Sequence, residues 1–410
     1  MIMFAQLSPA IRQYLIVTGN YWAFTLTDGA LRMLVVLHFH DLGYSPLQIA
    51  MLFLFYEFFG VVTNLVGGWL GARIGLNKTM NIGLFLQVLA LAMLLVPPSL
   101  LIVPWVMAAQ ALSGIAKDLN KMSAKSSIKA LVPEGADSKL YQWVAVLTGS
   151  KNTLKGVGFF LGGLLLTLLG FRGAVLAMLI GLALVWLFSV CTLTEDLGKA
   201  TSKPKFTEML SKSGPINYLS AARMCLFGAR DVWFVVALPV FMASQLGWDH
   251  WTVGSFLAIW VMAYGVVQGI APALTGAGQQ GRTPGRHQAV IWAAALALVP
   301  LAIALACYWE LQAQQALLAG LLVFGFVFAV NSSLHSFLIV QYADRDGVSL
   351  DVGFYYMANA MGRLLGTVLS GWVYQVYGLE ACLLISSGLV AVAAVISLRL
   401  PEQAPSLQGA

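Results

Sequence analysis

The sequence predicts an all-α membrane protein whose twelve transmembrane helices form two six-helix halves. Composition, long apolar runs and an internal repeat support this prediction. Of the 410 residues, 59% are hydrophobic and only 10% are charged, whereas a soluble domain carries about 25% charged residues. The apolar runs exceed the ~20 residues that a helix needs to cross a bilayer, and they recur along the whole chain. Their continuity favours helices over the alternating strands of a membrane barrel.

The apolar runs divide into twelve predicted spans. The first begins at Tyr14 and lacks a small-residue cleavage site, so we expect a retained span rather than a signal peptide. The predicted spans are 13–37, 46–70, 79–98, 101–129, 139–168, 173–193, 215–243, 251–275, 288–308, 312–341, 350–376 and 380–399.

The loops between these spans carry an asymmetric charge. With the N-terminus inside, the cytoplasmic segments hold thirteen lysines and arginines, and the outside segments hold only Arg172. Because positive loops stay on the cytoplasmic side, this asymmetry predicts that both termini are cytoplasmic.

The longest polar segment divides the chain into halves. We expect an N-terminal bundle at 1–193, a basic cytoplasmic linker at 194–214, a C-terminal bundle at 215–400 and a cytoplasmic tail at 401–410. An internal repeat supports the division. GWLGARIG begins at Gly68, GLLLTLLG at Gly163 and GWVYQVYG at Gly371, and the second and third lie 208 residues apart.

Two repeated halves of six spans resemble the major facilitator superfamily. The segment GWLGARIGLNK also resembles the cytoplasmic signature that this superfamily carries between its second and third spans. Arg73, Gly75 and Lys78 match the signature, whereas Ala72 stands where an acidic residue is usual. The salt bridge that the signature normally makes is therefore not carried over to this chain.

The predicted spans contain more cations than anions. Leaving out residues at the span ends, nine lysines and arginines lie within them against four acidic residues. A central Lys or Arg costs about 2.5–3.5 kcal/mol to insert, so nine facing lipid would cost roughly 20–30 kcal/mol, above the ~5–15 kcal/mol net stability of a folded protein. We therefore expect them to face a water-filled cavity between the halves. An excess of five positive charges there predicts an anionic substrate.

The positions of the charged residues along the spans indicate which of them are candidates for substrate binding. The 208-residue offset pairs Lys155 with Arg363, and Arg32 and Arg230 form a second rough pair. The stretch AKDLNKMSAKSSIKA carries a lysine every four residues, so all share one helix face. Lys125 and Lys129, its last two lysines, are expected to extend toward the cytoplasm. The predicted substrate-binding residues are Arg32, Lys117, Lys121, Lys151, Lys155, Arg230, Arg363, Asn331, His335 and Asn359.

Other roles for these residues stay open. Lys155 and Arg363 could instead pair structurally with Asp28 or Asp231, and the three uncharged candidates could be polar links between helices. Asp118 is expected to pair with a neighbouring helix. The predicted counter-ions or proton-coupling carboxylates are Asp28, Glu57, Asp118 and Asp231. With no HExxH, phosphate-loop or cysteine-pair metal motif, we expect no enzyme activity, metal, cofactor or nucleic-acid partner, and transport driven by gradients.

A more specific resemblance is clearest over 21–80. With the chain length and the segment AKDLNKMSAKSSIKALVPEG, it covers most of the chain. The elements TDGALRMLVVLHFH and YEFFGVVTNLVGGWL resemble the organoarsenical exporters of the ArsJ type, encoded in bacterial arsenic-resistance operons. The resemblance implies export of 1-arseno-3-phosphoglycerate across a bacterial inner membrane. It also implies a functional partnership with glyceraldehyde-3-phosphate dehydrogenase, which makes this ester when it uses arsenate in place of phosphate. A phosphate group contributes about −1.5 to −2 charges, so the cargo is a polyanion.

Two other classes of function are alternatives to this one. The first is a facilitator or antiporter for other organophosphate or carboxylate anions, whose charges would look similar. The second is a membrane sensor or scaffold that binds an anion without moving it, but the sequence offers no cytoplasmic segment long enough for a signalling domain.

Overall fold

The computed structural model describes residues 8–44, 52–193, 197–201, 204–205, 213–276, 284–309 and 313–402. All regular structure within these ranges is helical, so the predicted all-helical fold is confirmed. The beginning of the predicted second span, most of the predicted linker 194–214 and most of the predicted tail 401–410 lie outside the described residues.

The helices follow the predicted spans closely. Each of the twelve spans has a helical counterpart, because α7 and α13 each contain two successive helices and α8 and α9 together occupy the seventh span. The helices are α2 (Pro9–Asp41), α4 (Leu54–Ile74), α5 (Leu76–Met93), the short 3-10 helix η1 (Pro98–Leu100), α6 (Val103–Leu131), α7 (Asp137–Thr192), α8 (Gly214–Phe234), α9 (Ala237–Ser244), α10 (His250–Leu274), α11 (Arg286–Tyr308), α12 (Ala313–Tyr342) and α13 (Val348–Ser397).

Membrane-spanning character is uneven along the chain. In the described ranges, seven helical segments are long and apolar enough to cross a membrane, and α7 and α13 are among them. The helices α2, α4 and α6 fall outside this set. These three helices carry most of the predicted charged residues of the N-terminal half. The charged residues are therefore concentrated on a few helices rather than spread over all of them.

The repeated glycine pairs mark chain reversals. Gly170 has φ 65° and ψ 177°, and Gly378, 208 residues later, has φ 83° and ψ −176°. L-residues with a side chain essentially never adopt this conformation, so only glycine lets α7 and α13 turn back on themselves. Gly75 and Gly276 also have positive φ, at 97° and 70°. Gly276 ends GIAPALTG, a fourth seven-residue pair that the sequence prediction missed.

The chain divides into two compact units. Unit 1 comprises 1–136, 150–210 and 344–357, and unit 2 comprises 137–149, 211–343 and 358–410. Compared with the predicted halves, the beginning of α7 belongs to unit 2 and the beginning of α13 belongs to unit 1. Small residues explain both assignments. Within unit 1 a Cβ on Gly68 would overlap the Ser349 carbonyl, and within unit 2 a Cβ on Gly149 would overlap the backbone of α10.

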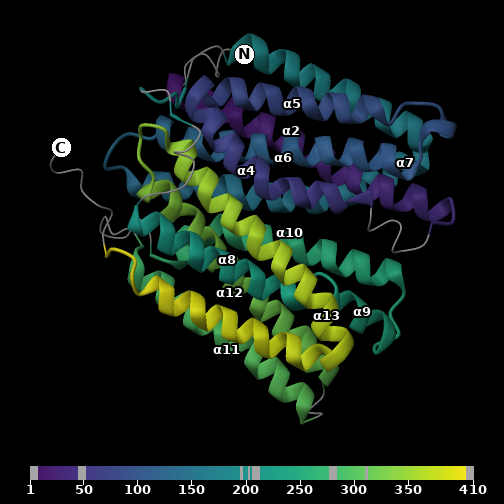
Figure 1. Ribbon diagram of the computed structural model, residues 1–410, viewed down its shortest axis with the longest axis vertical. Coiled ribbons are helices and arrows are strands. Elements are labelled where there is room, and N and C mark those ends of the chain that lie inside the picture. Colours follow the sequence, from purple (N-terminus) through teal and green to yellow (C-terminus); the bar gives the residue numbers. More distant parts are fainter. Residues whose placement is uncertain are drawn as a thin grey trace. The chain divides into compact units, whose positions relative to one another are not determined.

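In unit 1, α6 packs against α2, α4 and α5 (Figure 1). Glycines bring the backbones together, since a Cβ on Gly114 of α6 would lie 2.6 Å from the Tyr56 carbonyl oxygen of α4. The long α7 approaches α2 in the same way, through Gly29 and Gly158. These close contacts place the charged faces of α2, α4 and α6 next to one another.

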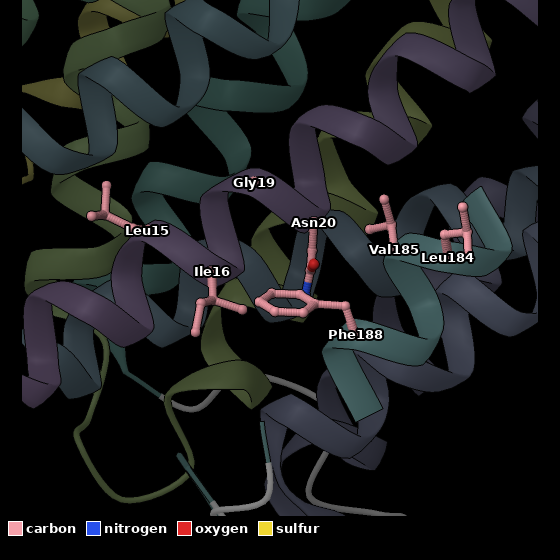
Figure 2. Close-up of a pocket in the computed structure, with 7 residues that line it drawn as sticks. All are labelled: Leu15, Ile16, Gly19, Asn20, Leu184, Val185 and Phe188. Carbon is pink, nitrogen blue, oxygen red and sulfur yellow. The ribbon is translucent and has the colours of Figure 1, made fainter. Parts of the chain in front are cut away.

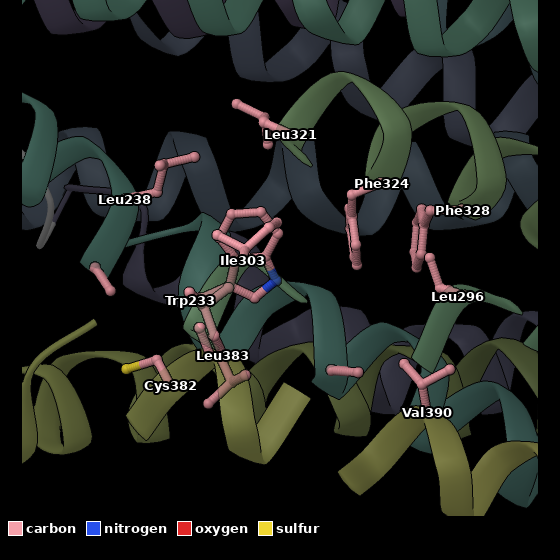
Figure 3. Packing of buried hydrophobic residues seen from close by; sticks show 14 of the residues in the cluster. Trp233, Leu238, Leu296, Ile303, Leu321, Phe324, Phe328, Cys382, Leu383 and Val390 are labelled. Atoms are coloured by element: carbon pink, nitrogen blue, oxygen red, sulfur yellow. The ribbon is translucent and has the colours of Figure 1, made fainter. Parts of the chain in front are cut away.

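In unit 2, α12 packs against α8, α10 and α11. Its core is built around Trp233, Phe324 and Phe328, with aliphatic side chains from α9, α11 and the end of α13 (Figure 3). The rings of Trp233 and Phe324 meet edge to face with centroids 5.0 Å apart, a favoured aromatic geometry. This core holds the polar faces of α8 and α12 in fixed positions.

Candidate functional site

The lysine ladder of α6, Lys117, Lys121 and Lys125, lies against tyrosine rings in unit 1. The Lys117 Nζ lies 3.8 Å from the ring centroid of Tyr56. The Nζ atoms of Lys121 and Lys125 lie 4.7 Å and 4.9 Å from the ring centroid of Tyr356. All three distances suit a cation–π interaction, which stabilises an ammonium group without neutralising it.

Two expectations about α6 were wrong. Asp118 pairs within α6 and not with a neighbouring helix. Its Oδ1 accepts a hydrogen bond of 2.6 Å from Lys121 Nζ. Lys125 does not extend to the surface: it is only 4% exposed and donates a hydrogen bond to the Tyr356 hydroxyl. The start of α13 covers this lysine, and sequence spacing within α6 could not reveal that cover.

Tyr56 organises the charged residues of α2 and α4. Its hydroxyl donates to both oxygens of Asp28, at 2.8 Å and 3.0 Å. The Arg32 guanidinium carbon lies 4.7 Å from the Tyr56 ring centroid, and Arg32 Nη2 donates to Glu57 Oε1 at 3.1 Å. Asp28 and Glu57 therefore act as partners of Tyr56 and Arg32. Sequence reasoning missed Tyr56, because an aromatic residue in an apolar span gives no distinct signal.

Two lysines of α7, Lys151 and Lys155, are also half-buried in unit 1. Lys151 Nζ donates to Asn152 Oδ1 at 3.2 Å. The Lys155 backbone passes close to α2, since a Cβ on Gly29 would lie 2.7 Å from the Lys155 carbonyl oxygen. Unit 1 thus gathers six of the predicted cations and three of the predicted carboxylates on α2, α4, α6 and α7.

In unit 2, two predicted substrate-binding arginines share one carboxylate. Asp231 is fully buried, and its two oxygens accept from Arg230 Nε at 2.6 Å and from Arg363 Nε at 3.3 Å. Arg363 is 34% exposed and Arg230 17%. The structural pairing of Arg363 with Asp231, one of the two roles left open by the sequence, is therefore present.

Arg223 is the most buried arginine of this group, and it was not among the predicted substrate-binding residues. It is 3% exposed, its Nε donates to Asn359 Oδ1 at 2.9 Å, and its Nη1 donates to the Ser332 carbonyl at 3.1 Å. Its guanidinium carbon lies 3.9 Å from the Phe227 ring centroid. Asn359 thus contacts Arg223, a contact that the prediction for Asn359 did not include. The sequence signal that could have identified Arg223 is the presence of an arginine inside a predicted span.

The two polar candidates of α12 have different surroundings. Asn331 Nδ2 donates to the Trp292 carbonyl of α11 at 2.7 Å and to the Val327 carbonyl at 3.0 Å, as a polar link between helices does. His335 is 1% exposed, and neither ring nitrogen has a hydrogen-bond partner among the described residues. An unsatisfied buried imidazole is costly, which makes His335 the stronger candidate for a ligand contact.

An apolar groove in unit 1 lies apart from these charged residues. It has a volume of about 480 Å³ and is formed by α2 and the second helix of α7 (Figure 2). Leu184 and Phe188, on its rim, are 63% and 55% exposed, as expected for side chains that face lipid. The described residues contain no cluster of His, Cys, Asp or Glu that could hold a metal ion.

Comparisons with known proteins agree on one fold. A family model described as the Major Facilitator Superfamily matches the chain in two overlapping segments, residues 15–284 and 219–410. The human organic anion transporter MFSD10 (TETRAN) is similar with a TM-score of 0.76 at 18% identity, over 95% of this chain and 100% of that chain. No curated protein matches the chain.

Two sugar symporters are similar to a comparable degree. The E. coli fucose:proton symporter FucP gives a TM-score of 0.72 at 13% identity, over 97% of this chain and 100% of that chain. The proton:xylose symporter XylE gives 0.73 at 13% identity, over 95% and 96%. Identities this low show a shared fold and carry no substrate information.

Proposed function

The chain belongs to the Major Facilitator Superfamily and is a multi-pass secondary transporter of small molecules, and from that premise we propose that its cargo is a polyanion exported from the cytoplasm. The observation that carries the proposal is the contact of three α6 lysines with the faces of Tyr56 and Tyr356. A ring face holds an ammonium group in place and leaves its charge available to an anion.

The balance of charge in unit 1 supports an anionic ligand. Arg32 and the three lysines are accompanied by three carboxylates, Asp28, Glu57 and Asp118, and α7 adds two further lysines. Because an excess of one sign of charge among partly buried groups is costly, a bound anion would stabilise this arrangement. A neutral sugar would leave the excess charge in place.

The arginines of unit 2 suit the same ligand class. Arg363 is partly exposed while it contacts Asp231, so a planar guanidinium edge can take part in bidentate binding of phosphate or carboxylate oxygens. Arg230 shares the same carboxylate. We propose Lys155 and the α6 lysines as the principal substrate contacts of unit 1, and Arg363 as the principal substrate contact of unit 2.

The specific cargo that we propose is 1-arseno-3-phosphoglycerate. This step depends on the resemblance of 21–80 to organoarsenical exporters. In this account the protein lies in a bacterial inner membrane with both termini in the cytoplasm, and it confers arsenate resistance together with glyceraldehyde-3-phosphate dehydrogenase. The competing proposal is transport of another organophosphate or carboxylate anion.

A resistance assay separates these two proposals. Arsenate-sensitive cells that express the chain should grow at higher arsenate concentrations only when the dehydrogenase is also present. Lys117→Ala at matched expression is the control for loss of transport. Equal protection without the dehydrogenase would indicate export of free arsenate, and no protection in either strain would favour a different organic anion.

A further inference from the structure

Tyr356, near the beginning of α13, is a shared contact of two ladder lysines. The Nζ atoms of Lys121 and Lys125 lie 4.7 Å and 4.9 Å from its ring centroid, and Lys125 also donates to its hydroxyl. Tyr356 is 3% exposed. One aromatic side chain of α13 thus covers two cations of α6 within unit 1.

The same part of α13 packs closely on α4. Ser349 Oγ donates to the Gly68 carbonyl at 2.7 Å. A Cβ on Gly353 would lie 2.8 Å from the Asn64 carbonyl oxygen and 2.9 Å from the Gly68 Cα. Within unit 1, the start of α13 is therefore held in two ways: by backbone packing on α4 and by the contacts of Tyr356 with the lysines of α6.

Exposure differs between the two lysines. The Lys121 side chain is 15% exposed and lies within reach of a ligand, whereas Lys125 is 4% exposed beneath Tyr356. An ammonium group has three donors and binds a phosphate oxygen through a charge-assisted hydrogen bond. Such a bond is stronger than contact with a ring face or a neutral phenol. The Lys121 Nζ also donates to Asp118 Oδ1 at 2.6 Å. An anion that reaches Lys121 therefore competes with Asp118 and with Tyr356 for these ammonium groups.

We propose that Lys121, Lys125 and Tyr356 form a latch, at which the anionic substrate and the start of α13 compete for the same two cations. This inference rests on the proposed function, because it requires an anion at the α6 lysines. Anion binding loosens the contact between α6 and α13. By thermodynamic reciprocity, loss of the Tyr356 contact strengthens anion binding. Tyr356 is thus a positioning residue that links substrate occupancy to the attachment of α13.

The test measures binding and attachment on the same protein. The purified full-length chain would carry Val352→Cys, a fully buried reporter on α13, with its four natural cysteines replaced. The probe is 3-phosphoglycerate, a stable compound that carries one phosphate and one carboxylate. Binding should be saturable, and the rate of maleimide labelling at position 352 should rise with occupancy. Saturable binding with an unchanged labelling rate would overturn the latch.

Substitution of Tyr356 tests the latch through the direction of the change in affinity for 3-phosphoglycerate. Tyr356→Leu should bind 3-phosphoglycerate about three- to thirtyfold more tightly, the range of a cation–π contact, and should label quickly without ligand. Tyr356→Phe keeps the ring and loses the hydroxyl, so its affinity gain should be smaller. The matched control is Tyr377→Leu on the same helix, where the side chain is 65% exposed and no change is expected.

The outcomes separate the latch from the proposed function. Weaker binding by Tyr356→Leu or Tyr356→Phe, with an unchanged melting temperature, would mean that the tyrosine only holds the lysines in place for the substrate. That result would overturn the latch and leave the anion transporter intact. No binding of 3-phosphoglycerate to the unsubstituted protein would overturn the anionic substrate, and with it the latch.

Discussion

The Nε of Arg363 lies 3.3 Å from Oδ2 of Asp231, while the other oxygen of that fully buried carboxylate accepts from Arg230. Asp231 thus holds two guanidinium groups at once. Because Arg230 contacts the other oxygen, Asp231 keeps a counter-ion when Arg363 is removed. The arrangement leaves Arg363 able to exchange part of its contact for a ligand without leaving a buried carboxylate unpaired.

Arg363→Ala should bind the anionic substrate about ten- to a hundredfold more weakly, the usual cost of one charge-assisted contact. Arg363→Lys keeps the charge and loses the planar fork, so its loss should be smaller. Lys155→Ala is expected to lose affinity to a similar degree. Titration of the purified variants with 3-phosphoglycerate, combined with thermal unfolding, measures affinity and stability together.

Asp231→Asn serves as the control for this series. It leaves both arginines without their shared carboxylate, so it should lower the free energy of unfolding by about 3–5 kcal/mol. If Arg363→Ala unfolds as easily as Asp231→Asn and regains stability when the two substitutions are combined, Arg363 is a structural partner. Unchanged affinity in a stable Arg363→Ala protein would also remove this residue from the binding site.

Lys117→Ala should abolish most transport, whereas Lys129→Ala should leave it nearly unchanged. Lys117 lies on the face of Tyr56 beside Arg32, and Lys129 lies in the last turn of α6. The two variants remove the same group from the same face of one helix, three turns apart. Transport rates at matched expression check the prediction, and equal losses would place the end of the functional lysine ladder nearer to the C-terminus of α6.

Gly170→Ala should lower the free energy of unfolding by about 1–3 kcal/mol, because φ 65° with ψ 177° strains any L side chain. No atom lies within 4 Å of the added Cβ, so the cost comes from the backbone alone. Gly163→Ala, at the other end of the same repeat, is the matched control. Its Cβ would meet Leu37 at an ordinary 3.8 Å, and its stability should be unchanged or higher in thermal unfolding. Equal losses would show that the reversal at Gly170 does not need glycine.

His335→Leu should weaken anion binding about tenfold and leave the melting temperature unchanged or higher. Removing two buried nitrogens that have no partner among the described residues relieves an unsatisfied polar group. A ligand donor would be lost at the same time. A lower melting temperature with unchanged affinity would instead assign His335 to the links between helices.

Span positions were predictable because the apolar runs are long and the bilayer fixes their length. Gly170, where the structure turns, lies in the gap between the predicted spans 139–168 and 173–193. The seven-residue glycine spacing identified Gly170 and Gly378 as equivalent, and positive φ explains why both must be glycine. The fourth pair ends at Gly276, 102 residues before Gly378 rather than 208, so the half-chain repeat does not predict it.

The candidate site was less predictable than the fold. Counting charges within spans identified Arg32, Lys117 and Arg363, but it could not show which partners they contact. Tyr56 and Tyr356 lie far from the ladder lysines in sequence and reach them only through the packing of α4 and α13 on α6. A tyrosine in an apolar span usually serves packing or anchoring, so its contact with a cation has no sequence signature.

Transport into everted membrane vesicles tests the central claim most directly. The cytoplasmic face of these vesicles is outside, and the bath would contain arsenate, glyceraldehyde 3-phosphate, NAD and glyceraldehyde-3-phosphate dehydrogenase, with and without a proton gradient. Arsenic accumulating inside is measured by mass spectrometry, with vesicles of Lys117→Ala as the control. The account predicts accumulation only when the dehydrogenase and its substrates are all present. Equal accumulation from arsenate alone, or none in the complete mixture, would contradict export of 1-arseno-3-phosphoglycerate.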